Sequence, residues 1–223
     1  MRRCVHCGGQ KLYRLSDGRL KCAACRKKLS PRRLERDQKV LECFCRRKSA
    51  LECAAELGMG YRSVLDRFME YRRAMAAHME RDFAAKKRTV AYDEYLYLDP
   101  SKRRDKRNIF DAHNLLTFHY DGKIYNLLLP DLSRFKPAMV EDGLEGVYYR
   151  EFERFMRRSR ITSSRDALIE RFWDSLEEFF ARYRGVNRQN FIYYLKEAEF
   201  LFNFDCKKLR SVVTAQPPGR GRR

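Results

Sequence analysis

The chain has 223 residues, of which 44% are hydrophobic and 13% are aromatic. This length and composition suit one sizeable core with a small additional module, and they exclude a chain that is disordered throughout. Lysine and arginine number 49 against 30 acidic residues, which gives a net charge of +19. Such a balance favours a polyanion, of which nucleic acid is the commonest, as the partner.

The positive charge is concentrated at the two ends of the chain. Residues 1–90 hold 24 basic and 10 acidic side chains, residues 91–206 hold 19 and 20, and residues 207–223 hold six and none. No apolar run approaches the ~18 residues that a membrane helix needs, and the N-terminus lacks the apolar core of a secretory signal. We therefore expect a cytoplasmic protein with no membrane partner, in which residues 207–223 form a basic disordered tail.

Four of the eight cysteines lie in two C-x2-C pairs, Cys4 with Cys7 and Cys22 with Cys25. Without an export signal, this spacing indicates a metal site, and four thiolates satisfy tetrahedral Zn²⁺. The residues between the pairs predict two short strands joined by a turn at residues 16–18. We expect residues 1–29 to form a zinc ribbon, with Zn²⁺ in a structural role because no ligand position remains for water.

Residues 30–88 carry the start and stop signals of three helices. Ser30 and Ser49 are typical residues before a first helical turn, and Gly58 is typical of a turn that ends a helix. The third helix begins near Tyr61. Helix, glycine turn and helix in this order predict a helix-turn-helix.

In a helix-turn-helix, the last helix of the motif contacts double-stranded DNA. We expect Arg62 and Arg67 to reach the major groove, and Arg72 and Arg73 to lie nearer the phosphates. The alternative is a plain three-helix packing unit. Three further cysteines fall on apolar helix faces and are expected to be core residues: Cys43, Cys45 and Cys53.

The remaining chain predicts an α/β domain over residues 89–206. Strands are expected at 89–98, 115–120, 123–129 and 146–149, with a hairpin turn at Asp121 and Gly122. Helices are expected at 133–142, 165–183 and 187–204, the last with an aromatic core face. A strand that carries Asp93 at its middle, within a mixed sheet flanked by helices, fits the ribonuclease-H-like fold.

Several motifs in this order resemble the bacterial insertion-sequence transposases of the ISXO-like type. They are the two cysteine pairs, YDEY at residues 92–95, GKIY at 122–125, GVYY at 146–149, IERFW at 169–173 and YLKEAEFLFN at 194–203. The resemblance covers most of the chain. It implies a bacterial, nucleoid-associated protein that acts in DNA transposition and recombination, with an N-terminal zinc ribbon, a helix-turn-helix and a DDE domain.

The family performs phosphoryl transfer on DNA with two divalent ions, Mg²⁺ or Mn²⁺, held by acidic residues. By resemblance, Asp93 matches the first acid and Glu170 lies in the motif that supplies the third. The position of the second acid is Arg150, which cannot ligate a metal ion. Two further family positions also differ, Ala167 and Glu177. The acids that could substitute are Asp142, Glu151 and Glu153.

The sequence therefore predicts one of three kinds of protein. The first is a metal-dependent strand-transfer transposase that works as a homodimer on DNA. The second is a catalytically inactive, domesticated relative that binds DNA as a regulator, with Arg150 in the place of the missing acid. The third is an interaction protein whose zinc ribbon contacts other proteins.

Overall fold

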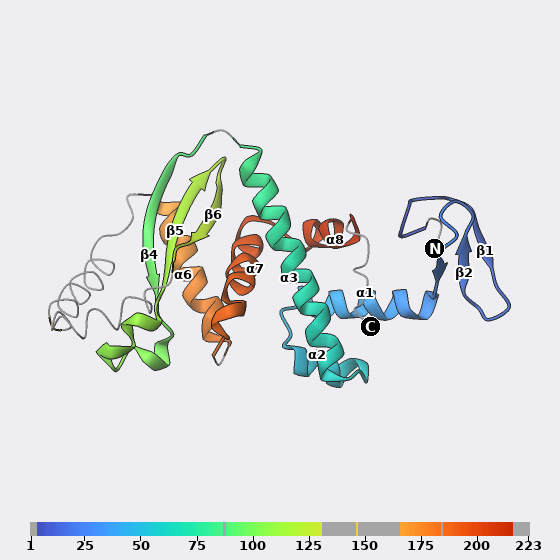
Figure 1. Cartoon of the computed structure of the whole chain (residues 1–223), viewed down its shortest axis with the longest axis horizontal. Helices are drawn as coiled ribbons and strands as arrows, with labels where there is room; N and C mark the ends of the chain where they lie inside the picture. Colours follow the sequence, from blue (N-terminus) through green and yellow to red (C-terminus); the bar gives the residue numbers. More distant parts are fainter. Residues whose placement is uncertain (1–3, 87, 131–145, 147–165, 184, 216–223) are drawn as a thin grey trace. The chain divides into compact units, whose positions relative to one another are not determined.

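The computed structural model describes residues 4–86, 88–130, 146, 166–183 and 185–215 (Figure 1). It divides into two compact units: unit 1 comprises Met1–Met75 and Asp205–Arg223, and unit 2 comprises Ala76–Phe204. Each unit combines helices with a three-stranded sheet, which confirms a mixed α/β protein. No helix in the described ranges is both long and apolar enough to cross a lipid bilayer.

The N-terminal part of unit 1 is a small antiparallel sheet. Strands β1 (Leu12–Arg14), β2 (Leu20–Cys22) and β3 (Lys28–Leu29) lie in this order. The two strands expected from the sequence are present, and β3 is an addition. One face of the sheet packs its leucines around the cysteines, and this small core also takes in Leu34 from the first helix.

Three helices complete the first part of unit 1: α1 (Pro31–Cys45), α2 (Ala50–Leu57) and α3 (Tyr61–Ala84), of which α3 continues into unit 2. The local start and stop signals operate as predicted. The Ser30 hydroxyl accepts a hydrogen bond from the Arg33 N–H, and Ser49 and Glu52 form a reciprocal capping box. Gly58 ends α2 at φ 60°, a left-handed conformation that glycine adopts without strain.

Aromatic side chains hold α1 against α3. The Phe44 ring lies 4.8 Å from that of Phe68 and 5.5 Å from that of Tyr71, both edge to face. All three side chains are buried. Cys43 and Cys53 are buried free thiols in the same part of the chain, as the sequence predicted.

The segment after Asp205 differs from the expected disordered tail, because α8 (Cys206–Ala215) is a helix. It buries Leu209 and Val212, three residues apart and therefore on one face. Its first residue, Cys206, forms a disulfide with Cys45 at the end of α1. Cys45 is thus a bridging residue and not the core thiol that the sequence indicated.

Unit 2 contains a second antiparallel sheet of β4 (Ala91–Tyr97), β5 (His113–Tyr120) and β6 (Lys123–Leu128), in that order. Asp121 at φ 47° and Gly122 at φ 69° form the turn of the β5–β6 hairpin, as predicted. The three described strands pair only antiparallel. The helix expected at 133–142 and residues 147–149 of the expected fourth strand lie outside the described residues.

Helices α6 (Ala167–Ala181) and α7 (Phe191–Asn203) pack on one face of this sheet (Figure 1). Their shared core contains Leu115 and Ile124 from the sheet together with Phe172 and Leu176 from α6. On the other face, the Phe83 ring near the end of α3 stacks 4.0 Å from the Tyr125 ring. Short 3-10 helices lie in the described connections: Pro100–Lys102, Lys106–Asp111 and Arg188–Asn190.

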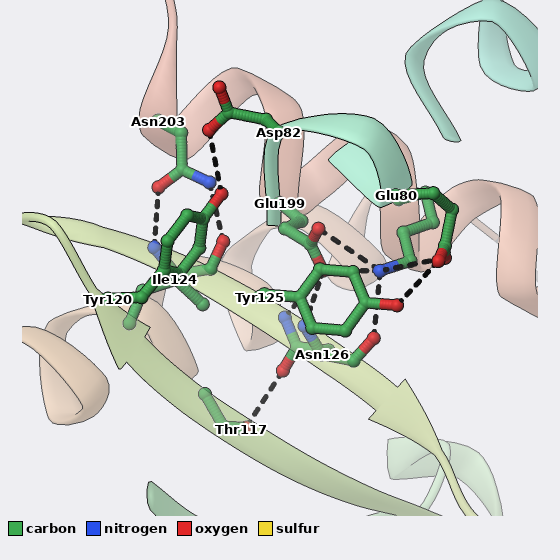
Figure 2. Close-up of polar contacts among 10 residues, drawn as sticks. Glu80, Asp82, Thr117, Tyr120, Ile124, Tyr125, Asn126, Glu199 and Asn203 are labelled. Atoms are coloured by element: carbon green, nitrogen blue, oxygen red, sulfur yellow. Dashed lines mark hydrogen bonds and ion pairs between the residues drawn. The ribbon is translucent and has the colours of Figure 1, made fainter. Parts of the chain in front are cut away.

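Polar side chains of α7 satisfy the free edge of β6 (Figure 2). The Asn203 amide accepts from the Ile124 N–H at 2.8 Å and donates to the Ile124 carbonyl at 2.6 Å. Glu199 accepts from the Asn126 N–H at 2.7 Å, and Lys196 donates to the Asn126 carbonyl at 2.8 Å. Side chains three, four and seven residues apart on one helix face thus take the place of a neighbouring strand.

Candidate metal centre and nucleic-acid interface

The four cysteines predicted to bind metal lie together in unit 1. Their sulfur atoms are all within 4.8 Å of one another. Cys4 Sγ lies 3.7 Å from Cys25 Sγ, and Cys7 Sγ lies 3.5 Å from Cys22 Sγ. A tetrahedral ion with Zn–S bonds of about 2.3 Å would place its sulfurs ~3.8 Å apart, so the donor set fits Zn²⁺.

The two cysteine turns have the same backbone geometry. The N–H of Gly8 donates to the carbonyl of Cys4, and the N–H of Arg26 donates to the carbonyl of Cys22. Gly8 and Arg26 are both left-handed, at φ 72° and φ 57°. Each C-x2-C pair is therefore held by the same turn, which aims two sulfurs at one point.

The surroundings of the sulfurs shift their pKa values in opposite directions. The backbone N–H of Cys25 lowers the pKa of the Cys22 thiol to about 7, whereas, against the lowering effect of the Lys27 N–H, burial and the neighbouring thiols raise the pKa of Cys25 to about 11. A Cβ atom at Gly9 would lie 3.3 Å from the sulfurs of both Cys7 and Cys22, so glycine leaves this space to the cluster. All four ligands come from the protein, which makes a bound Zn²⁺ structural and leaves no position for a reacting water.

The four arginines predicted to contact DNA differ in accessibility. Arg62 is 83% exposed in its side chain and lies 3.4 Å from Asp66 on the next turn of α3. Its neighbours Tyr61 and Ser63 are exposed as well, so the first turn of α3 is open to solvent. Arg73 is also exposed.

Arg67 and Arg72 hold the helices of unit 1 together. The Arg67 guanidinium pairs with Glu70 at 2.8 Å and with Asp37 of α1 at 3.3 Å, which ties α3 to α1. Arg72 is 2% exposed, with its guanidinium 5.7 Å from the centre of the Phe44 ring. A buried guanidinium cannot meet a phosphate, so the position of Arg72 argues against its predicted DNA contact.

Asp93 lies near the start of β4 and Glu170 near the start of α6, and these two starts lie at the same end of the β4–α6 contact. Tyr95 stacks on Trp173 at 4.9 Å, and the Tyr97 ring lies 4.7 Å from that of Phe180. These contacts show that α6 runs along β4 in the same direction. Asp93 precedes Tyr95 by two residues on the same strand face, and Glu170 precedes Trp173 by three.

The described residues do not bring a third acid close enough to Asp93 and Glu170 to hold a metal ion with them. Across those ranges, the four cysteines are the only group of three or more histidine, cysteine or acidic side chains close enough to hold a metal ion. The described chain therefore offers no support for a Mg²⁺ or Mn²⁺ site. Arg150 and the possible substitutes Asp142, Glu151 and Glu153 lie outside the described residues.

Near Asp93 and Glu170, the structure contains a pair that sequence reasoning missed. Asp166 caps α6 by accepting from the N–H groups of Leu168 and Ile169, and it lies 2.7 Å from His119 Nδ1 on β5. Burial disfavours its charge, yet the bonds from His119 and Ile169 outweigh this and lower the pKa of Asp166. The aspartate at a helix start was a readable signal, whereas its histidine partner was not.

Glu177, at a position where the transposases that this chain resembles have lysine, bonds other side chains of unit 2. Its carboxylate accepts from both the Arg103 guanidinium, at 2.6 Å, and the Tyr95 hydroxyl, at 2.5 Å. It thereby fixes the loop after β4 to α6.

No family model, no curated protein and no solved structure matches this chain.

Proposed function

We propose that this chain is a double-stranded-DNA-binding protein of the insertion-sequence transposase type, and that unit 1 holds the DNA. The observation that carries the proposal is the division of charge. Unit 1 has 26 basic and 9 acidic residues, a net charge of +17, whereas unit 2 has 23 and 21, a net charge of +2. A strongly basic unit joined to a near-neutral one is the electrostatic signature of nucleic-acid binding.

The elements of unit 1 support this proposal. The order of α2, the Gly58 turn and α3 is that of a helix-turn-helix, and the exposed side chains of Tyr61, Arg62 and Ser63 stand where such a motif reads base edges. The cysteine cluster would bind one structural Zn²⁺ and complete a zinc ribbon. A homodimer on DNA would repeat the contact on a second half-site.

Binding of the full-length zinc-loaded protein to a labelled random-sequence DNA duplex tests the proposal. Fluorescence anisotropy measured over a series of salt concentrations gives the affinity and its salt dependence. We expect the affinity to fall steeply with salt. For each phosphate contact, the logarithm of the association constant should fall by about 0.9 for every tenfold rise in salt concentration. The absence of binding in 50 mM salt would contradict the proposal.

The catalytic half of the resemblance leads to a second candidate, metal-dependent strand transfer. The placement of Asp93 and Glu170 at one end of the β4–α6 packing supports it. Arg150 in the sequence position of the second acid weighs against it, because a fixed positive charge repels a metal ion. We therefore propose that the protein binds DNA without joining it, as a catalytically inactive relative.

A strand-transfer assay with Mg²⁺ or Mn²⁺ separates the two candidates. Wild type should give no joined product on DNA that carries the terminal repeats of the element. Joining by wild type that is lost in Asp93→Ala and retained in the exposed control Glu178→Ala would establish the enzyme instead.

A further inference from the structure

Three basic side chains lie in a row along the first half of α1. Arg32, Arg36 and Lys39 are spaced four and three residues apart, so they share one helix face. All three are exposed. Seven residues of helix span ~10 Å, a length equal to about three base-pair steps along the axis of duplex DNA.

This row has no acidic partner, unlike Arg33, Arg62 and Arg67 on α1 and α3. Asp37 on α1 pairs with Arg33 of the same helix and with Arg67 of α3, which also pairs with Glu70. In the chain described here, Arg32, Arg36 and Lys39 form no ion pair. Glu35 lies beside the row without pairing to it, which leaves the exposed face with a net charge of +2.

Two further acids in the helical part of unit 1 are also paired locally. Glu56 pairs with Arg46 and Lys48, and Asp66 pairs with Arg62. The attraction available to an outside anion is therefore greatest where no such partner exists. On α1, that place is the row of Arg32, Arg36 and Lys39, and in the described chain Lys207 and Arg210 on α8 likewise form no ion pair.

The start of α1 is also unusual for a stable helix. Its first turn contains no acidic residue and holds Arg32 and Arg33 instead. The partial positive charge of a helix N-terminus favours carboxylates there and disfavours arginine. Helix stability alone does not account for this arrangement, whereas an anion bound along the helix does.

We infer that Arg32, Arg36 and Lys39 form a phosphate-contacting row that holds the backbone of duplex DNA. The inference rests on the proposed function and makes it specific. It replaces the predicted phosphate contact of Arg72, which is buried, by contacts from the exposed row on α1. Contacts of this kind add affinity without reading sequence, so they act equally on any duplex.

The test compares two variants that remove the same charge. One carries Arg32→Gln, Arg36→Gln and Lys39→Gln. The control carries Arg104→Gln, Arg171→Gln and Arg182→Gln, three exposed cations of unit 2. Both are measured against wild type on a random duplex, with circular dichroism and zinc content confirming that each is folded.

We expect the α1 variant to lose about 10- to 100-fold in affinity near 100 mM salt and to lower the salt slope by about 2.7, three contacts at 0.9 each. The control should change both by much less. If wild type binds duplex and the two variants behave alike, the row is overturned while the proposed function stands. If wild type binds no duplex, both the row and the proposed function are overturned.

Discussion

The side-chain amide of Asn203 on α7 hydrogen-bonds both the N–H and the carbonyl of Ile124 on β6. One residue thereby satisfies both backbone groups of Ile124 on an edge that would otherwise be free to pair with another strand. The position lies in the YLKEAEFLFN motif, so part of that motif has a structural explanation.

Asn203→Ala should lower the free energy of unfolding by about 1–3 kcal/mol, because two backbone groups in a partly buried place lose their partner. Urea denaturation monitored by circular dichroism measures this. Gln189→Ala, an exposed amide in the short turn before α7, is the control and should change stability by less than about 0.5 kcal/mol. Equal stability of the two variants would show that water replaces Asn203 without loss.

The neighbouring pair Lys196 and Glu199 is almost fully buried, at 1% and 0% exposure. The Lys196 Nζ lies 3.1 Å from both carboxylate oxygens and 3.6 Å from the centre of the Tyr125 ring. Lys196→Met leaves the carboxylate unpaired and should destabilise the protein by about 3–5 kcal/mol.

The loss of unfolding free energy in Lys196→Met should depend on pH. Burial raises the pKa of Glu199, although Lys196 and Asn126 favour its charged form. The folded state then binds a proton more tightly than the unfolded state, so stability from this group rises as pH falls from the folded pKa toward the unfolded one. The deficit of Lys196→Met should shrink from pH 7 to pH 5, and adding Glu199→Gln should remove that pH dependence. A deficit that stays constant with pH would contradict this assignment.

The sequence predicted the elements whose signals are local. Ser30, Ser49 and Gly58 mark helix ends through bonds to their own neighbours, and the hairpin at Asp121 and Gly122 depends on two backbone angles. The cysteine cluster was equally readable, since the spacing of its pairs defines the turn geometry.

The sequence did not predict features that depend on distant partners. Arg72 reads as a surface cation until Phe44 covers it. The burial of Lys196 and Glu199 depends on β6, which places two backbone groups beside them. The helix α8 was missed because its basic composition resembles a tail, whereas Leu209 and the bridge from Cys206 anchor it.

The cysteine cluster predicts one Zn²⁺ per chain. Elemental analysis of purified protein should find it, and Cys22→Ser should lose it together with the fold of the ribbon. Cys53→Ala, which removes a buried thiol outside the cluster, should keep the metal. Wild-type protein without stoichiometric zinc, and with a fold indifferent to a chelator, would contradict the site.

The Cys45–Cys206 bridge predicts six reactive thiols in the oxidised, denatured and metal-free chain, and eight after reduction. The bridge joins residues 161 apart in sequence, and closing so long a loop stabilises the folded chain by about 4–5 kcal/mol. Reduction or Cys206→Ser should therefore expose α8 to proteolysis. Eight reactive thiols before reduction would show that the bridge does not form.

Hydrogen–deuterium exchange of the full-length protein with and without duplex DNA tests the central claim most directly, because it locates the bound DNA. The account predicts slower exchange in peptides of α1 and of the first turns of α3, with little change in α6 and α7. Slower exchange confined to α6, α7 and the β4–β6 sheet would place the DNA on unit 2 and contradict the account.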